Sequence, residues 1–271
     1  MHLRRSALFT YVSIAAILAA LLAGCGGNSS LGPSANTNSR VRVFNGMGGC
    51  PGNGAIDVLA SNNTEPFNPA GGVAYGSASN YMLVRSGNGL TTNVYAAGTT
   101  TNALAPQAPF TLSPHDPGTN NGTYTITASG VCGQPVGSAA APQLARLIDN
   151  PPTPPANQAL VRLVNLSPDA GNITLSNVSG NPPQTVPIVT TGVAYTQSSN
   201  YVAVTPIAGQ SFNFSVSSGG QVLPIPAGSS TQTLQAGKAY TVFVFGEVNP
   251  ANGGQLINMA VVQDAPITSP P

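Results

Sequence analysis

The sequence contains one stretch twice. Gly-Val-Ala-Tyr, a short polar run and Asn-Tyr occur in residues 72–84 and again, 120 residues later, in residues 192–204. A period of this length corresponds to a whole domain and is too long for a solenoid of small units. The 271 residues of the chain are enough for two ordinary domains. We therefore predict two copies of one domain, called copy 1 (residues 39–150) and copy 2 (residues 159–267).

Short strands are predicted throughout both copies. The copies open with related apolar runs at residues 41–45 and 161–165, and they close with others at residues 144–149 and 259–264. Further short runs lie between them, separated by Gly and Pro, and none has the 3.6-residue period of a helix. This pattern predicts an all-β fold of sandwiches, with roughly seven or eight strands in each copy.

Two local signals add detail to the strand prediction. Phe212, Phe214 and Val216 alternate with polar residues, which is typical of a half-buried strand. Residues 86–89 contain Asn-Gly, the strongest short signal for a hairpin turn. Gly209 lies at the matching place in copy 2, where we expect it to adopt a positive φ.

Tyr124 and Tyr240 each open a late apolar strand. Leu234 precedes Tyr240 in a pattern that resembles the tyrosine corner of immunoglobulin-like sandwiches, where the hydroxyl bonds back to upstream backbone. The corresponding interval in copy 1, from Leu112 to Tyr124, is twice as long. The alternative is an ordinary aromatic strand residue at each position. The corner favours two tandem immunoglobulin-like β-sandwich domains.

The first residues are interpreted as an export signal. A short basic segment precedes an almost wholly apolar run at residues 7–23, as in a secretory signal peptide. Residues 22–25, Leu-Ala-Gly-Cys, resemble the lipobox of bacterial lipoproteins. This resemblance implies a signal peptide at residues 1–24 and lipid attachment at Cys25; a plain signal peptide is the alternative. Because Gly26 is not the Asp of inner-membrane retention, we expect a cell-envelope lipoprotein of the outer membrane.

Three further segments are predicted to lie outside the sandwiches. Residues 25–38 are rich in Gly, Ser and Asn and are expected to form a flexible tether. Residues 151–158 form a Pro-rich linker that should be stiff and should space the copies apart. Residues 268–271 form a tail. No apolar run after the signal approaches the roughly 18 residues of a membrane helix.

Cys50 and Cys132 are predicted to form a disulfide. Lipid attachment would consume Cys25, which leaves two thiols in an oxidising compartment. Each follows a predicted strand of copy 1, and the two can meet if those strand ends lie at one end of the sandwich. The alternative is a pair of free thiols.

Residues 161–170 and 234–242 resemble the bacterial domain-of-unknown-function family DUF4397. The resemblance extends over both copies and implies export and a β-sandwich, without an activity. Copy 1 departs from the opening motif at residues 46–52, which are Gly-rich. An acidic residue that the family often has in its second strand is Asp57 in copy 1, whereas copy 2 has Thr174.

Groups that carry chemistry are scarce. Charged residues make up 6% of the chain, against roughly 25% in an average globular protein. The net charge of +1 argues against nucleic acid as a partner. His115, beside Asp116, is the one histidine after the signal, and no nucleophile, base and orienting group occur together. The seven acidic residues are too scattered for a calcium loop. No catalytic residue, metal or cofactor is predicted.

These observations indicate a lipid-anchored cell-envelope protein with a non-catalytic binding, adhesion or structural role. Its partners would be the membrane, through the N-terminal lipid, and an envelope or extracellular protein or glycan that the sequence does not identify. The alternative is an envelope hydrolase, or an inhibitor or accessory subunit of an enzyme.

Lipidation of Cys25 is directly testable. Radiolabelled palmitate should enter the wild-type protein and should not enter Cys25→Ala, because the variant lacks the cysteine to which the acyl chains would be attached. Labelling is measured on immunoprecipitated protein, with Cys50→Ala as the matched control that keeps its label. Equal labelling of Cys25→Ala and the wild type contradicts the prediction.

Overall fold

The computed structural model describes residues 38–265 with short internal gaps. The gaps are residues 61–66, 69–70, 106–107, 115–121, 180–181, 208 and 251–252. All described residues belong to one unit, Asn36–Pro271. Cys25, the predicted signal peptide and His115 lie outside the described residues.

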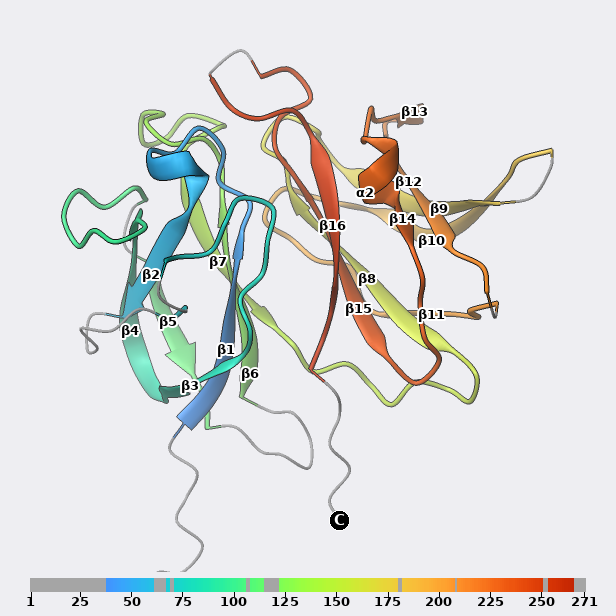
Figure 1. The fold of residues 1–271 in the computed structure, drawn as a ribbon, viewed down its shortest axis with the longest axis horizontal. Coiled ribbons are helices and arrows are strands. Elements are labelled where there is room, and N and C mark those ends of the chain that lie inside the picture. Colours follow the sequence, from blue (N-terminus) through green and yellow to red (C-terminus); the bar gives the residue numbers. More distant parts are fainter. Residues whose placement is uncertain are drawn as a thin grey trace, which may run out of the picture. The chain divides into compact units, whose positions relative to one another are not determined.

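Both copies are built from strands, which confirms the predicted all-β sandwich class (Figure 1). Copy 1 comprises β1 (Asn38–Asn45), the short 3-10 helix η1 (Gly52–Gly54), β2 (Ile56–Ala60), β3 (Met82–Arg85), β4 (Gly87–Ala96), β5 (Ala108–Leu112), β6 (Thr123–Ser129) and β7 (Gln143–Ile148). Copy 2 comprises β8 (Ala159–Leu166), β9 (Ile173–Ser179), β10 (Gln184–Val193), β11 (Val202–Val204), β12 (Phe212–Ser218), β13 (Gln221–Val222), α2 (Ala227–Ser230), β14 (Thr231–Gln232), β15 (Ala239–Phe245) and β16 (Asn258–Gln263).

Each copy contains two sheets around its own core. Copy 1 has a four-stranded sheet of order β3-β1-β6-β7 and a three-stranded sheet of order β2-β4-β5. Copy 2 has a four-stranded sheet of order β11-β8-β15-β16 and a five-stranded sheet of order β10-β9-β12-β13, with β14 beside β12. Matching strands thus occupy matching places in the two four-stranded sheets. Separate apolar clusters fill the two sandwiches.

A parallel strand pair lies at the centre of each four-stranded sheet. β1 runs parallel to β6, and β8 runs parallel to β15. The tyrosine near the start of the second strand bonds back to upstream backbone in both copies. The hydroxyl of Tyr124 accepts the N–H of Ser113 at 3.0 Å, and that of Tyr240 accepts the N–H of Gln235 at 3.0 Å. The tyrosine corner is therefore confirmed, despite the longer interval in copy 1.

The parallel pair also explains the cysteine pairing of copy 1. Because β1 and β6 run in the same direction, the segments that follow them emerge at the same end of the sheet. Gly48 bridges Val131 there, and Cys50 is joined to Cys132 with a Cα–Cα distance of 5.0 Å. This geometry supports the predicted disulfide.

The predicted hairpin at residues 86–89 is wrong. β3 pairs with β1, whereas β4 pairs with β2 and β5, so the chain crosses between sheets at Ser86. Asn88 and Gly89 lie within β4, where its register with β5 shifts between Gly87 and Leu90. The local turn signal is overridden because both strands have partners elsewhere. In copy 2, Gly209 has the expected positive φ of 74°.

The expectation that residues 151–158 space the copies apart is also wrong. The outer faces of the two four-stranded sheets share a buried apolar cluster, formed by Phe44, Leu147, Val164, Leu166, Phe243 and Phe245. The phenyl rings of Phe44 and Phe243 stack with centroids 3.9 Å apart. We call this contact surface between the copies the seam.

The sequence pattern of β8 shows why the seam forms. Every residue of β8 is buried, and successive side chains of a strand point to opposite faces of its sheet. Val161 and Leu163 belong to the core of copy 2, whereas Val164 and Leu166 belong to the seam. A strand with two apolar faces requires cover on both sides, which copy 1 supplies.

Loss of the disulfide should destabilise the protein. Replacing both cysteines, as Cys50→Ala with Cys132→Ala, should lower the free energy of unfolding by about 2–4 kcal/mol, because an 82-residue loop is no longer closed. Urea denaturation of oxidised protein measures the change. Dithiothreitol should destabilise the wild type to a similar extent and leave the double variant unchanged. A double variant as stable as the oxidised wild type contradicts the prediction.

Candidate functional site

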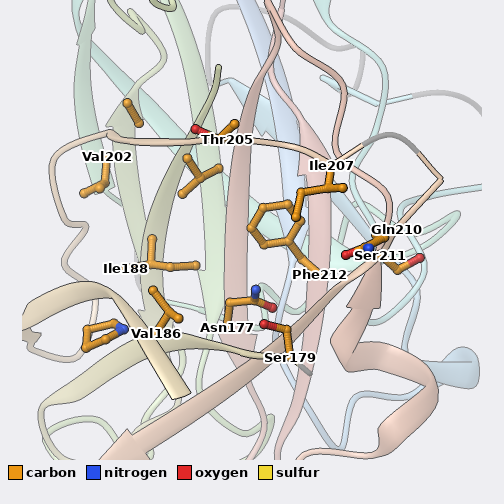
Figure 2. A pocket seen from close by; sticks show the side chains of 13 residues that line it. Asn177, Ser179, Val186, Ile188, Val202, Thr205, Ile207, Gln210, Ser211 and Phe212 are labelled. Carbon is orange, nitrogen blue, oxygen red and sulfur yellow. The ribbon is translucent and has the colours of Figure 1, made fainter. Parts of the chain in front are cut away.

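A groove opens between two outer strands of copy 2 (Figure 2). β10 is the last strand on one side of the five-stranded sheet, and β11 is the last strand on one side of the four-stranded sheet. The cavity between these strands has a volume of about 380 Å³. This volume falls within the range of small-molecule sites in proteins, roughly 300–1,000 Å³.

The lining of the groove is mainly apolar. Its apolar side chains are Val186, Ile188, Val202, Val204, Ile207 and Phe212. Figure 2 shows Ile188, Phe212 and Ile207 turned toward the same space, with Asn177 and Ser179 beside them. None of the lining residues is charged. The groove can therefore hold an uncharged, partly apolar group and can offer it amide and hydroxyl hydrogen bonds.

Two lining residues extend apolar surface into solvent. Val186 on β10 is 53% exposed, and Ile207, which follows β11, is 59% exposed. They face a groove whose interior contacts the core of copy 2, because Val202, Val204 and Phe212 pack against that core. Exposed apolar side chains at the mouth of an apolar cavity are typical of a binding surface.

The shape of β10 helps to create this groove. Its register with β9 shifts between Pro187 and Val189 and again between Val189 and Val193. Such irregularities bend a strand away from the regular sheet. Pro187 is compatible with an outer strand because the missing N–H is not needed by a further neighbour.

A second cavity continues along the same strands. It has a volume of about 520 Å³ and shares Ile188 and Val202 with the first. Its other lining residues include Thr190, Gln197 and Asn200, so this end is more polar. We call the two cavities together the β10–β11 groove.

Copy 1 differs at the corresponding place in the chain. The segment after β2 inserts Phe67, which is 2% exposed, into the core of copy 1. Its N–H bonds to the carbonyl oxygen of Val58 on β2. Val84 on β3, the counterpart of the groove residue Val204, belongs to the same core cluster. The phenyl ring of Phe67, a residue of copy 1 itself, therefore helps to fill the core on this side of the sandwich.

Four charged side chains gather at a second place, inside the seam. Arg42 of copy 1 donates from Nε to Thr125 Oγ1 at 2.7 Å, and it donates from its terminal nitrogens to the carbonyl of Gln263 and to Asp264 of copy 2. The side chains of Arg42 and Asp264 are 1% and 0% exposed.

Arg162 of copy 2 makes the equivalent hydrogen bonds toward copy 1. Arg162 donates from Nε to Thr241 Oγ1 at 2.8 Å, and from its terminal nitrogens to the carbonyl of Ile148 and to Asp149 of copy 1. Arg42 and Arg162 are 120 residues apart, at matching positions of the two opening strands. The seam is thus tied by two reciprocal Arg–Asp pairs, which we call the crossed pairs.

The repeated stretch of the sequence supports these pairs. Tyr81 donates its hydroxyl hydrogen to Asp149 at 2.8 Å, and Tyr201 donates to Asp264 at 2.8 Å. Their rings also face the guanidinium groups, with Arg42 4.8 Å from the centroid of Tyr81 and Arg162 4.8 Å from that of Tyr201. The sequence analysis did not identify the crossed pairs. An Arg within each apolar opening strand, Arg42 and Arg162, is the sequence signal that could have indicated them.

The electrostatics of the seam keep its ions charged. Burial alone would raise the pKa of Asp149, but the charges of Arg162 and Arg42 and hydrogen bonds from Thr125 and Tyr81 outweigh it and hold that pKa below its usual range. Burial would lower the pKa of Arg42, but nearby Asp149 and Asp264 raise it. Since these groups are enclosed and mutually paired, their role is to join the copies.

Glycines let the backbones of the two copies approach closely. A Cβ on Gly48 would lie 3.0 Å from the backbone nitrogen of Gln255, and one on Gly49 would lie 3.0 Å from the carbonyl oxygen of Gly253. Gly49 also has a positive φ of 68°. The Gly-rich run of copy 1 therefore packs against a loop of copy 2 in addition to forming the turn before Cys50.

Asp57, which the sequence singled out, and Asp169, in the opening motif of copy 2, have separate local roles. Asp57 accepts hydrogen bonds from the side-chain nitrogen of Asn68 and the N–H of Gly98. Asp169 accepts the N–H groups of Val248 and Asn249, both at 2.8 Å. Each carboxylate ties loops of its own copy. Among the described residues, no group of three or more His, Cys, Asp or Glu side chains could hold a metal ion.

Comparison with known proteins identifies a family. The profile of DUF4397, "Domain of unknown function", matches residues 39–176, just over half of the chain. Curated protein sequences contain no significant match.

Solved structures show only a distant likeness. The C-terminal domain of AlgF from P. aeruginosa is 20% identical with a TM-score of 0.28, and the match covers 40% of this chain and 98% of that one. Candidate cell adhesion proteins from Bacteroides ovatus and Bacteroides eggerthii are each 12% identical, with TM-scores of 0.18 and 0.19. These matches cover 84% and 85% of this chain and 96% and 97% of those. Likeness at these TM-scores says nothing about the function of this chain.

Removing one ion of the crossed pairs should destabilise the protein in a pH-dependent manner. At pH 7, Asp149→Asn should lower the free energy of unfolding by about 3 kcal/mol, because the buried Arg162 loses its counter-ion. The pKa of Asp149 is depressed in the folded protein, so its contribution is present above the unfolded value of about 3.9 and is lost as the pH falls through the folded value.

Urea denaturation at pH 7 and pH 3 measures this effect. The difference between wild type and Asp149→Asn should shrink at the lower pH. The matched control is Arg162→Met with Asp149→Asn, which removes both charges and should cost less than the single change at pH 7. A pH-independent difference, or a double variant less stable than Asp149→Asn, contradicts the assignment.

Proposed function

Since the chain belongs to the DUF4397 family, whose description assigns no activity, we propose its function from the groove and the N-terminal sequence. The protein acts as a non-catalytic binding module of the bacterial cell envelope. Lipid on Cys25 anchors it to the outer membrane, and residues 25–38 tether the folded part. Copy 2 is a second member of the same family, a reading supported by the matching order of the four-stranded sheets.

The observation that carries this proposal is the β10–β11 groove. It combines an apolar interior, exposed apolar residues at its mouth and polar groups at one end, without a charged side chain in its lining. This combination favours recognition over chemistry, because proton transfer and nucleophilic attack require titratable groups that face the ligand. The crossed pairs contain such groups, but they are enclosed in the seam.

The lipid anchor rests on the sequence alone. Residues 22–25 match a lipobox after a basic and an apolar segment. In the described part of the chain, no helix is long and apolar enough to span a bilayer. An acylated cysteine would supply stable attachment because several acyl chains satisfy the requirement for more than one membrane signal.

The ligand follows from the chemistry of the groove. Without a charge in the lining, a charged ligand would lose hydration and gain no counter-ion. We therefore propose an uncharged segment of an envelope or extracellular protein, with apolar side chains that enter between β10 and β11. A neutral glycan is the alternative, because the second cavity offers hydroxyl and amide groups.

Val186→Arg tests the groove. A charge at its mouth should weaken ligand binding about tenfold or more, since an apolar contact is replaced by a hydrated cation, while the fold should persist because Val186 is half exposed. Val222→Arg is the matched control: Val222 is 70% exposed on β13 of the same sheet, away from the groove lining.

The probes are a phage library of random 12-residue peptides and an array of neutral glycans, applied to the full-length protein. Binders should be uncharged and should bind Val222→Arg as well as wild type. Peptide binders support the first ligand class, and glycan binders the alternative. If neither probe yields a binder that Val186→Arg weakens, the groove is not the binding site.

A further inference from the structure

The seam carries an inference that is independent of the groove. We propose that it is an exchangeable interface whose partner is a second molecule of this chain. Copy 1 of one chain then binds copy 2 of another, and the second half of each chain completes the same contact in return. The product is a domain-swapped dimer with two seams.

Each copy has its own strand ladders and its own apolar core, which makes exchange possible. All strand pairs in the described residues join strands of the same copy. Opening the seam therefore breaks side-chain contacts and loop packing while leaving every strand ladder intact. The two sandwiches also have separate apolar cores.

An opened chain cannot remain open without cost. Arg42, Asp149, Arg162 and Asp264 are each at most 3% exposed in the closed chain, and Phe44 is fully buried. Separation leaves apolar surface in water and breaks both crossed pairs. These groups regain their partners if the chain recloses or if a second chain supplies the opposite copy.

The seam surface of copy 1 fits copy 2 and does not fit a second copy 1. Phe44 lies next to Thr127 in the first parallel pair, whereas the matching pair in copy 2 is Val164 and Phe243. The stack between Phe44 and Phe243 therefore requires one copy of each kind. Two copies of the same kind would bring together Phe44 with Thr127, or Val164 with Phe243, and neither combination repeats the aromatic stack.

The exposed, Pro-rich connection between the copies is the segment that would act as the hinge. Residues 150–158 include four prolines, and except for Pro151 the described side chains of residues 151–158 are at least partly exposed. Proline-rich segments adopt an extended form of about 3.1 Å per residue and resist folding back. In the closed chain the segment turns after Pro155, where the N–H of Gln158 bonds to the carbonyl oxygen of Pro155 at 3.1 Å, and we expect the hinge to open at this turn.

Two complementary variants test exchange in the full-length chain. Arg42→Met removes the arginine that contacts Asp264, and Asp264→Asn removes the aspartate that Arg42 reaches across the seam, so that Arg42 keeps only Asp149 of its own copy, 3.7 Å from Nε, as an ion-pair partner among the described residues. A swapped pair of these two chains contains one intact Arg42–Asp264 contact and one contact from which both charges are gone. Neither chain has this option alone, because in each closed chain one buried charge lacks its partner from the other copy.

The two variants are co-expressed with different affinity tags, extracted in detergent and purified through one tag. The Arg42→Met and Asp264→Asn chains should co-purify about tenfold more than two differently tagged Arg42→Met chains. The matched control carries both changes in one chain; it has no unpaired charge and should not co-purify with itself above the wild-type level. Separate chains in the mixed sample overturn the proposal.

If either single variant fails to accumulate, the wild type carries the test. Two tagged wild-type chains are unfolded together in urea and refolded at increasing protein concentration. Mixed dimers that increase with concentration support exchange, because refolding lets copies meet in trans. Chains that remain monomeric at every concentration overturn it.

Discussion

The two crossed Arg–Asp pairs are the interaction on which the arrangement of this chain depends. Arg42 and Arg162 each extend from the opening strand of one copy to the aspartate that ends the other. A buried guanidinium is tolerated only when its charge and its donors have partners. Each Nε has a threonine of its own copy as partner, whereas the terminal nitrogens find a carbonyl oxygen and an aspartate in the opposite copy. The two sandwiches therefore satisfy their buried ions together, and the seam selects one register between them.

The repeated stretch has its structural meaning in this setting. Ser79 accepts the N–H of Val43 on β1, and Ser199 accepts that of Leu163 on β8, each at 2.9 Å. Two residues later, the repeated tyrosines donate to the aspartates of the crossed pairs. The repeated stretch thus holds the opening strand of its own copy and the aspartate at the end of that copy.

The two sandwiches differ away from the seam. Copy 1 joins Cys50 to Cys132 and places Phe67 in its core, so its loops and one side of its sandwich are tied down. Copy 2 lacks cysteine and has the irregular β10, beside which the β10–β11 groove opens. One copy is thereby reinforced and the other offers apolar surface, which is consistent with a division between support and recognition.

The sequence by itself determined the strand class and the tyrosine corners and led us to predict a repeated unit, because alternation, spacing and period are read from the order of residues along the chain. It also indicated the Cys50–Cys132 pair. Only the tertiary structure showed that residues 86–89 form no hairpin, and only the tertiary structure revealed the seam and the groove. These depend on which strands become neighbours in space: Arg42 meets Asp264 across more than 200 residues, and no local pattern specifies that contact. The sequence contains an Arg inside each apolar opening strand, but only the packing of the two sheets identifies the aspartate that pairs with it.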